Sequence, residues 1–326
     1  MSRMSPRQTQ IAIKEIKDFF EKKLADKLNL IRVSAPLFVR PESGLNDNLS
    51  GVEKAVSFQM RKYGQDIEIV QSLAKWKRLA LKSYGFSIGE GIYADMNAIR
   101  PDEILDSTHS IYVDQWDWEK VIKKDDRTDE YLVNIVENIY EAFKETEKYI
   151  NGIYPDMFKK KLPKTIKFIT SQELEDIYPN DTPEERENLI AKEFGAVFVS
   201  KIGRKLKSGE YHGTRSPDYD DWSLNGDIIF WNYITNEALE LSSMGIRVDE
   251  KALNEQLEMA NAEYRKSLEY HKQLLEGKLP YTVGGGIGQS RICMFFLEKR
   301  HIGEVQASVW TEEKLEESRN NNIFIL

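Results

Sequence analysis

The chain has 326 residues, 40% hydrophobic and 31% charged, so it is long enough to bury a large core and too apolar for a disordered chain. Its net charge of −8 argues against an extended nonspecific nucleic-acid surface, which needs clustered Lys and Arg. The single cysteine, Cys293, excludes an intrachain disulfide and favours a reducing compartment. Because the polar first ten residues do not resemble a signal peptide and no apolar run could span a bilayer, we expect a cytoplasmic protein without a membrane partner.

The hydrophobic pattern predicts helices and strands that do not alternate strictly. Apolar residues at Ile13, Ile16, Phe20 and Leu24 predict an amphipathic helix over 7–28, followed by a strand over 30–36 that ends at Pro36. Further strands are predicted at 66–70, 91–99, 109–118, 165–170, 195–200, 226–232, 237–246 and 281–286. Further helices are predicted at 73–83, 130–150, 184–193, 249–275 with a break, and 289–298. This order favours an α+β fold, a mostly antiparallel sheet flanked by helices, and no linker divides the single domain expected over 1–326.

A glycine-rich segment, Gly284 to Arg291, lies between a predicted strand and a predicted helix. It lacks the ending of a Walker loop, and it departs from the dinucleotide fingerprint. Glycines at 284, 286 and 288 would leave one face of the strand flat, where a planar ring could lie. Arg291 could stack on that ring or could instead reach a phosphate. The alternative is a packed glycine turn followed by a surface arginine.

A second candidate is Arg100, which directly follows the predicted strand 91–99 and precedes Pro101. A guanidinium at a strand end can clamp a phosphate with two parallel hydrogen bonds. The alternative is an ordinary surface arginine.

Acidic residues fall within several predicted strands, where they need partners. Alternation places Gln115 and Asp117 on one strand face, where they could hold an amine. Asp227 and Glu240 come from adjacent strands and are candidate oxygen ligands for a Mg²⁺ that arrives with a nucleotide. Each carboxylate could instead be an edge-strand charge. The four histidines show no metal-ligand spacing, and Cys293 is predicted to be core.

Together these segments resemble the three sequence motifs of class II aminoacyl-tRNA synthetases. Residues 7–36 resemble the motif at the dimer interface, 100–103 the motif whose arginine grips the α-phosphate, and 284–291 the motif that ends in an adenine-side arginine. One departure is Ser290, which stands where the synthetase motif usually has glutamate.

Six collinear segments narrow the resemblance to the ammonia-dependent asparagine synthetase family, namely 47–51, 72–78, 112–118, 217–222, 240–248 and 284–291. The resemblance implies a synthetase-like catalytic domain without a tRNA-binding appendage. It also implies a homodimer that converts L-aspartate, ATP and ammonia into asparagine, AMP and pyrophosphate through a β-aspartyl adenylate.

The resemblance also assigns candidate roles. For ATP, these are Arg100 on the α-phosphate, Gly286 and Gly288 under the adenine, Arg291 beside it, and Asp227 and Glu240 on Mg²⁺. For aspartate, they are Lys77 and Arg247 on the α-carboxylate, Gln115 and Asp117 on the α-ammonium, and Ser242 and Ser243 on either ligand. Asp47 is the first choice for the base that deprotonates ammonium, and Asp220 is the second.

Two other functions share this fold and ATP site. One is a class II aminoacyl-tRNA synthetase paralogue that binds or forms an aminoacyl adenylate, and the other is a metabolite-binding dimer without catalysis. The acidic balance and the collinear segments argue against the first. The paired arginines and carboxylates argue against the second.

Overall fold

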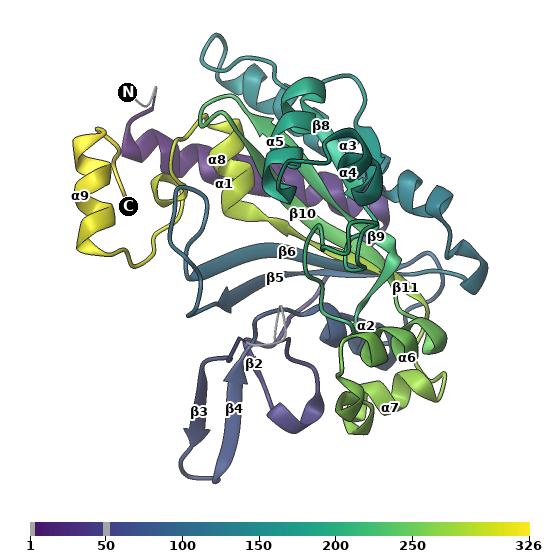
Figure 1. The fold of residues 1–326 in the computed structure, drawn as a ribbon. Coiled ribbons are helices and arrows are strands. Elements are labelled where there is room, and N and C mark those ends of the chain that lie inside the picture. The colour runs from purple at the N-terminus through teal and green to yellow at the C-terminus, as the bar shows by residue number, and fades with distance from the viewer. Residues whose placement is uncertain (1–3, 48–52) are drawn as a thin grey trace.

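The computed structural model describes residues 4–47 and 53–326 and contains two sheets (Figure 1). The strands of the large sheet are β1 (Leu30–Arg32), β5 (Gly91–Ile99), β6 (Tyr112–Val121), β7 (Lys167–Thr170), β8 (Ala196–Ser200), β9 (Asp220–Asn232), β10 (Glu237–Arg247) and β11 (Thr282–Gly288). The small sheet contains β2 (Phe38–Val39), β3 (Ser57–Met60) and β4 (Gln65–Ile69). The helices are α1 (Pro6–Leu28), α2 (Ala74–Ser83), α3 (Asp129–Ile153), α4 (Ser171–Ile177), α5 (Pro183–Phe194), α6 (Glu250–Met259), α7 (Glu269–Leu275), α8 (Gln289–Phe296) and α9 (Glu312–Asn320).

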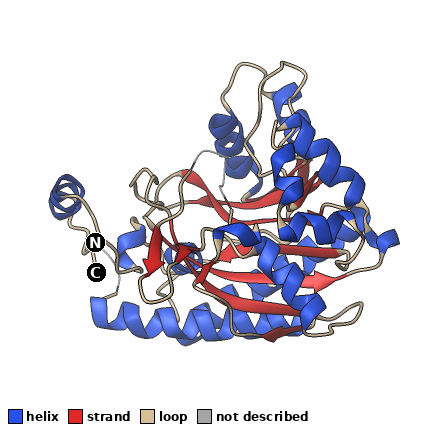
Figure 2. Ribbon diagram, turned by 90° about the horizontal axis from the view of Figure 1, so that it is seen from below, coloured by secondary structure: helices blue, strands red, loops and turns tan. Residues whose placement is uncertain are grey.

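The large sheet has the strand order β1-β5-β6-β11-β10-β9-β8-β7. Only its two edge pairs, β1 with β5 and β7 with β8, are parallel, and all of its other neighbouring strands are antiparallel. Helices cover both of its faces (Figure 2). The predicted α+β fold with a mostly antiparallel sheet is therefore confirmed.

Helix α1 begins and ends where local chemistry dictates. Ser5 caps its first turn in a reciprocal capping box with Gln8, and Pro6 occupies the first helical position, where no hydrogen-bonded N–H is required. Asn29 ends the helix in the left-handed conformation, φ 57°, and directs the chain into β1. The predicted boundaries of 7–28 are therefore confirmed to within one residue.

The two faces of the large sheet differ in polarity. One face packs on α1, α3 and α8 and holds the main apolar core, including Trp116 and Trp118 of β6, with Phe20 of α1 5.0 Å from the Trp116 ring. Residues at the intervening positions of β6, Gln115 and Asp117, point to the opposite face. This second face carries the polar residues, and α2 packs on it.

Several elements differ from the sequence prediction. Strand β1 ends at Arg32 rather than at Pro36, because after Val33 donates to the Tyr93 carbonyl (2.9 Å) the chain leaves the edge of the sheet. Strand β9 begins at Asp220, earlier than the predicted 226. Its first residues are polar and show no hydrophobic alternation, but Asp220 has a buried partner in Arg247. Strands β2 and β3 and helices α4 and α9 were not predicted.

Two further expectations concern the core and the membrane. Cys293 is fully buried, and burial raises the pKa of its thiol to about 12, which confirms it as a core residue. In the part of the chain that the structure describes, no helix is long and apolar enough to cross a membrane.

Candidate active site

A cavity of about 310 Å³ opens on the polar face of the large sheet. Its lining includes seven residues predicted from the sequence, namely Arg100, Gln115, Glu240, Ser243, Gly286, Gly288 and Arg291. It also includes residues that the sequence did not single out, among them Glu103, His109, Thr214, Arg215, Ser216 and Tyr219. Strands β6, β10 and β11 thus meet the loop after β5 and the loop before β9 around one space.

The two predicted arginines occupy different parts of this lining. Arg100 directly follows β5, its backbone N–H donates to Ile111 (2.8 Å), and its buried Nε has no partner within the described residues. Arg291 lies in the first turn of α8 and donates from Nη1 to the Glu240 carbonyl (2.9 Å). Arg100 therefore retains free hydrogen-bonding capacity for a ligand.

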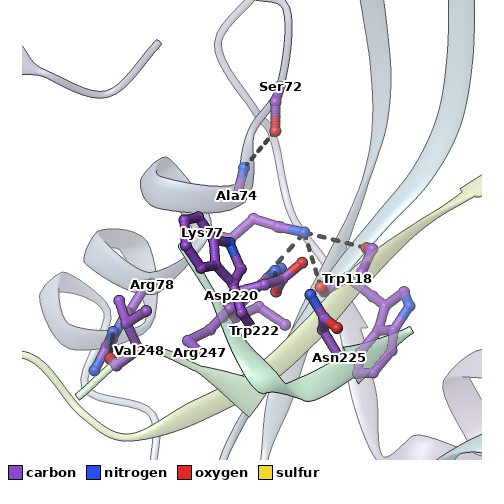
Figure 3. A network of polar contacts seen from close by, with 12 residues as sticks. Ser72, Ala74, Lys77, Arg78, Trp118, Asp220, Trp222, Asn225, Arg247 and Val248 are labelled. Carbon is purple, nitrogen blue, oxygen red and sulfur yellow. Dashed lines mark hydrogen bonds and ion pairs between the residues drawn. The ribbon is translucent and has the colours of Figure 1, made fainter. Parts of the chain in front are cut away.

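Beside the cavity, Lys77 of α2 is held by contacts with two neighbouring strands, β6 and β11. Its Nζ donates to Asp117, to the Trp118 carbonyl (2.9 Å) and to the Gly285 carbonyl (3.2 Å), and the side chain is fully buried. Figure 3 shows Lys77 reaching from α2 to Trp118. Since an ammonium has only three N–H donors, these contacts use all of them.

Arg247 lies at the end of β10 and binds two carboxylates. Its Nε and Nη2 donate to Glu119 at 2.9 and 2.7 Å, and its Nη1 donates to Asp220. Although burial alone would raise it, the pKa of Glu119 is held below its usual value by Arg247 and Lys77. Glu119 was not predicted, but it continues the alternation of Gln115 and Asp117 on the same face of β6.

Asp47 is a buried carboxylate that makes no hydrogen bond of normal geometry within the described residues. Asp47 is only 2% exposed, and both of its carboxylate oxygens are buried without a partner among the described residues. Burial raises the pKa of Asp47 and the charge of Asp218 adds to this shift, whereas the charge of Lys75, the nearby Ser216 hydroxyl and the charge of Arg100 oppose it. Residues 48–51 of the same predicted segment lie outside the described residues.

The second choice for the base, Asp220, is placed differently. It is also buried, and burial raises its pKa, but Arg247 donates directly to its Oδ1. Asp220 is thus already committed to an ion pair, whereas Asp47 forms none with the residues that the structure describes.

A further buried cluster surrounds Asp218 and was not predicted. Its carboxylate accepts from Lys75 (3.0 Å), Arg265 (3.0 Å), His271 (2.8 Å) and the Ser216 hydroxyl (2.8 Å). Despite burial, Lys75 and His271 hold the pKa of Asp218 well below its usual value. The cluster therefore fixes the segment that brings Ser216 and Tyr219 into the cavity lining.

The predicted magnesium ligands lie on adjacent strands. Asp227 pairs with Ser243 of β10, its Oδ2 accepts from Arg215, and its Oδ1 is buried without a partner. Burial and the charge of Glu240 raise the pKa of Asp227 to about 7, against the opposing effect of Arg215. The described residues contain no cluster of three His, Cys, Asp or Glu. Two carboxylates, one with a free oxygen, fit an ion such as Mg²⁺ that takes its other ligands from phosphates and water.

Comparisons with known proteins show the family of the chain. A sequence model of the family described as aspartate-ammonia ligase matches residues 7–322. The chain belongs to this family. It is 61% identical to the aspartate–ammonia ligase of Clostridium tetani over 98% of the chain and 94% of that protein. It is 62% identical to that of Fusobacterium nucleatum over 98% of the chain and 97% of that protein.

Solved structures with the same fold are class II aminoacyl-tRNA synthetases. The chain resembles asparaginyl-tRNA synthetase from Entamoeba histolytica in complex with asparaginyl-adenylate, with a TM-score of 0.65 and 14% identity, over 92% of the chain and 66% of the synthetase. It also resembles the Pyrococcus horikoshii enzyme complexed with asparaginyl-adenylate, with a TM-score of 0.62 and 14% identity, over 92% of the chain and 68% of that enzyme. The predicted class II synthetase-like fold of this ligase family member is thereby confirmed.

Several predicted site residues do not line the cavity, namely Asp47, Lys77, Asp117, Asp220, Asp227, Arg247 and Ser242. For Ser242, and for the predicted slot at Gly284, the structure gives a specific reason. Ser242 pairs with Ile228 and Ile287 and points to the apolar face, because neighbouring residues of a strand point to opposite sides. The predicted flat slot does not extend to Gly284, where an added Cβ would lie 2.0 Å from Glu119 Oε2 and 2.7 Å from Arg247 Nη2. The ion pair between Arg247 and Glu119, rather than a bound ring, occupies the Gly284 end of β11. Of the three predicted glycines, Gly286 and Gly288 border the cavity.

Proposed function

We propose that the chain ligates ammonia to the β-carboxylate of L-aspartate at the expense of ATP, through a β-aspartyl adenylate, and releases AMP and diphosphate. The observation that carries this proposal is the cavity that Arg100 and Arg291 line together with Gly286 and Gly288. An uncharged strand surface between two guanidiniums suits a nucleotide, whose flat base and anionic phosphates need these two environments.

The chemistry of the first half-reaction explains the need for Arg100. Hydroxide is a poor leaving group, so the β-carboxylate attacks the α-phosphate and diphosphate departs. Negative charge grows on the phosphate oxygens during this step, and Arg100, with its unpartnered Nε, is the group we assign to stabilise it. Asp227 and Glu240 would hold Mg²⁺, which supplies further neutralisation of phosphate charge when bound.

The aspartate-binding role is assigned to residues beside the cavity. Gln115 borders the cavity, and its side chain lies over Gly286, while Asp117 follows on the same strand face. These two groups offer oxygens to the α-ammonium, and Ser243 offers a hydroxyl. Arg247 retains donors beyond its two carboxylates and is assigned to the α-carboxylate. Because the three donors of Lys77 are used, we assign Lys77 to the orientation of Asp117.

In the second half-reaction, ammonia attacks the activated carbonyl and AMP leaves. Ammonium must first lose a proton, and we assign this step to Asp47, with Asp220 as the alternative. Within the described residues the oxygens of Asp47 have no hydrogen-bond partner of normal geometry, so this buried carboxylate can attract the cation, and its raised pKa makes it a better proton acceptor than an ordinary aspartate.

The proposal includes a homodimer of single-domain, cytoplasmic subunits that act without tRNA. The edge strand β1 exposes Ile31 (61%), and α1 exposes Ile11 (53%), so the segment that resembles the dimer motif offers apolar surface. The large sheet draws its strands from Leu30 to Gly288, which supports one catalytic domain.

The test is an incubation with ATP, Mg²⁺, L-aspartate and ammonium, followed by measurement of AMP, ADP and asparagine. The expected products are AMP and asparagine in equal amounts, both dependent on ammonium. Formation of ADP instead of AMP would overturn the adenylate route. Transfer of an amino acid to added tRNA would favour the synthetase paralogue.

A further inference from the structure

Two polar atoms of opposite character are left unpartnered in one wall of the site. Nε of Arg215 and Oδ1 of Asp227 are both buried, and neither has a hydrogen-bond partner within the described residues. The two side chains already contact each other through Arg215 Nη2 and Asp227 Oδ2. A buried ion pair that leaves a donor and an acceptor unused is incompletely satisfied, since each unused atom has lost its water.

Arg215 lines the cavity. It lies before β9, next to Ser216, which is fixed by the buried Asp218 cluster, and residues 214–216 all border the cavity. Its side chain is 16% exposed, and its remaining contact is from Nη1 to the Thr214 carbonyl (3.1 Å). The guanidinium is thus held beside the nucleotide cavity by one carboxylate and one carbonyl.

The charges around Arg215 suit an exchange of partners. Asp227 and Glu240 are the carboxylates assigned to Mg²⁺, and in the protein alone Arg215 is the cation paired with Asp227. A Mg²⁺–nucleotide complex brings a cation that suits Asp227 and, at the same time, phosphate oxygens that suit a guanidinium fork. Such a ligand would satisfy both unused atoms at once, which neither free metal nor free phosphate would do.

We infer that Arg215 shields Asp227 in the free protein and becomes a second phosphate-binding arginine, on the β- and γ-phosphates, when the Mg²⁺–nucleotide binds. Arg100 binds the α-phosphate, which stays in AMP. Arg215 binds the β- and γ-phosphates, which leave as diphosphate. This inference rests on the proposed function and adds to it a residue that distinguishes ATP from AMP.

The first test compares nucleotide binding to Arg215 variants by isothermal titration calorimetry. For Arg215→Gln, we expect affinity for Mg²⁺ with α,β-methylene-ATP to fall by about tenfold or more, with AMP affinity changed less than about twofold. Arg215→Lys keeps the positive charge but cannot make the two-pronged contact, so its affinity for the analogue should lie between those of the unmodified protein and Arg215→Gln. Arg204→Gln is the control, because Arg204 is an exposed arginine of the same segment whose ion-pair partner is Glu255 (3.8 Å). Equal losses for AMP and the analogue, or no loss for either, would overturn the inference.

The second test measures Mn²⁺ binding by electron paramagnetic resonance in the absence of nucleotide. If Arg215 shields Asp227, Arg215→Gln binds Mn²⁺ about tenfold more tightly than the unmodified protein, and Arg215→Lys does not. The added substitution Asp227→Asn should remove the gain. An Arg215→Gln variant that is folded by circular dichroism and shows no gain would reject the shielding role. Failure of the unmodified protein to form AMP and asparagine would instead reject the proposed function.

Discussion

Arg247 of β10 and Glu119 of β6 form a two-pronged ion pair across the intervening strand β11, with Nε–Oε1 and Nη2–Oε2 distances of 2.9 and 2.7 Å. The pair passes over Gly284, the residue of β11 that is in register with Glu119. Only a residue without a side chain leaves room for it. The glycine thus serves the charged network beside the cavity rather than the nucleotide surface itself.

Substitution of this glycine should therefore damage both stability and activity. In Gly284→Ala, the new methyl group would meet Glu119 Oε2 at 2.0 Å and force the ion pair apart. We expect a loss of about 1–3 kcal/mol in the free energy of unfolding, as for overpacking elsewhere in protein interiors, and slower aspartate-dependent ATP–pyrophosphate exchange. Urea unfolding and the exchange assay measure these two effects.

Gly152→Ala is the matched control for this substitution. Gly152 lies in α3, and an added Cβ would meet nothing within 4 Å, so the change should be neutral or slightly stabilising. If Gly284→Ala behaved like Gly152→Ala, the strand would have to move aside without cost, and the ion pair would not depend on the glycine.

Arg100 is expected to contribute mainly to adenylate formation. Arg100→Ala should slow aspartate-dependent ATP–pyrophosphate exchange by about 2–4 kcal/mol of activation free energy, as for loss of one preorganised donor in the transition state. Arg100→Lys should recover little, because an ammonium cannot make the two-pronged contact. Near-normal exchange by the alanine variant would remove Arg100 from the α-phosphate.

The sequence predicts the polar face of the sheet well where strands alternate regularly. Gln115 and Asp117 lie on one face because strand alternation is a local property, and Gly286 and Gly288 border the cavity for the same reason. Ser242 was assigned to the site with its neighbour Ser243, although two successive strand residues cannot share a face.

The missed residues depend on contacts between distant segments. Asp218 collects Lys75, Arg265 and His271 from three other parts of the chain, and no local spacing announces such a cluster. Arg215 lies in a loop, where hydrophobic periodicity carries no information. Tertiary contacts rather than strand or helix periodicity place these groups.

Association through the N-terminal segment gives a third prediction. Light scattering should show a dimer, and Ile31→Asp on the edge strand β1 should shift it toward monomer, because a charge would replace apolar surface at the proposed contact. Val309→Asp is the control, since Val309 is 72% exposed and lies outside the segment. A stable, active monomer of the unmodified protein at micromolar concentration would contradict this prediction.

The Asp218 cluster should make stability depend on pH. Because Lys75 and His271 lower the pKa of Asp218 in the folded protein, its ionised form stabilises the fold above its usual pKa of 3.8, and this contribution is lost as pH falls below that value. Asp218→Asn should therefore reduce the free energy of unfolding at pH 7 by about 3 kcal/mol, since it leaves buried cations unpaired. Urea unfolding from pH 7 to pH 3 should show the difference shrinking. The control is Asp176→Asn, because Asp176 is exposed and its contacts are with Lys207 and Gln172 on the surface, so the change should shift the urea midpoint little.

Asp47 gives the prediction that separates the two half-reactions. If Asp47 attracts and deprotonates ammonium, Asp47→Asn should leave ATP–pyrophosphate exchange nearly unchanged and slow the capture of pre-formed adenylate by ammonia, by about a hundredfold or more. Burial raises the pKa of Asp47, so in the unmodified protein the capture rate should fall as pH decreases through that raised pKa, and the asparagine variant should lose this dependence.

The expected effect of Asp47→Asn on stability has the opposite sign to its expected effect on capture, a combination that a merely structural role would not produce. A carboxyl whose pKa is higher in the folded protein is more costly to keep ionised there than in the unfolded chain, so its contribution to stability is lost as pH rises through the folded pKa. The neutral amide of Asp47→Asn avoids that cost, and the variant should be at least as stable as the unmodified protein at pH 7. Asp220→Asn is the comparison, because removing the Arg247 partner should impair both half-reactions. Equal losses in exchange and capture for Asp47→Asn, with reduced stability, would make Asp47 a binding or folding residue and move the base to Asp220.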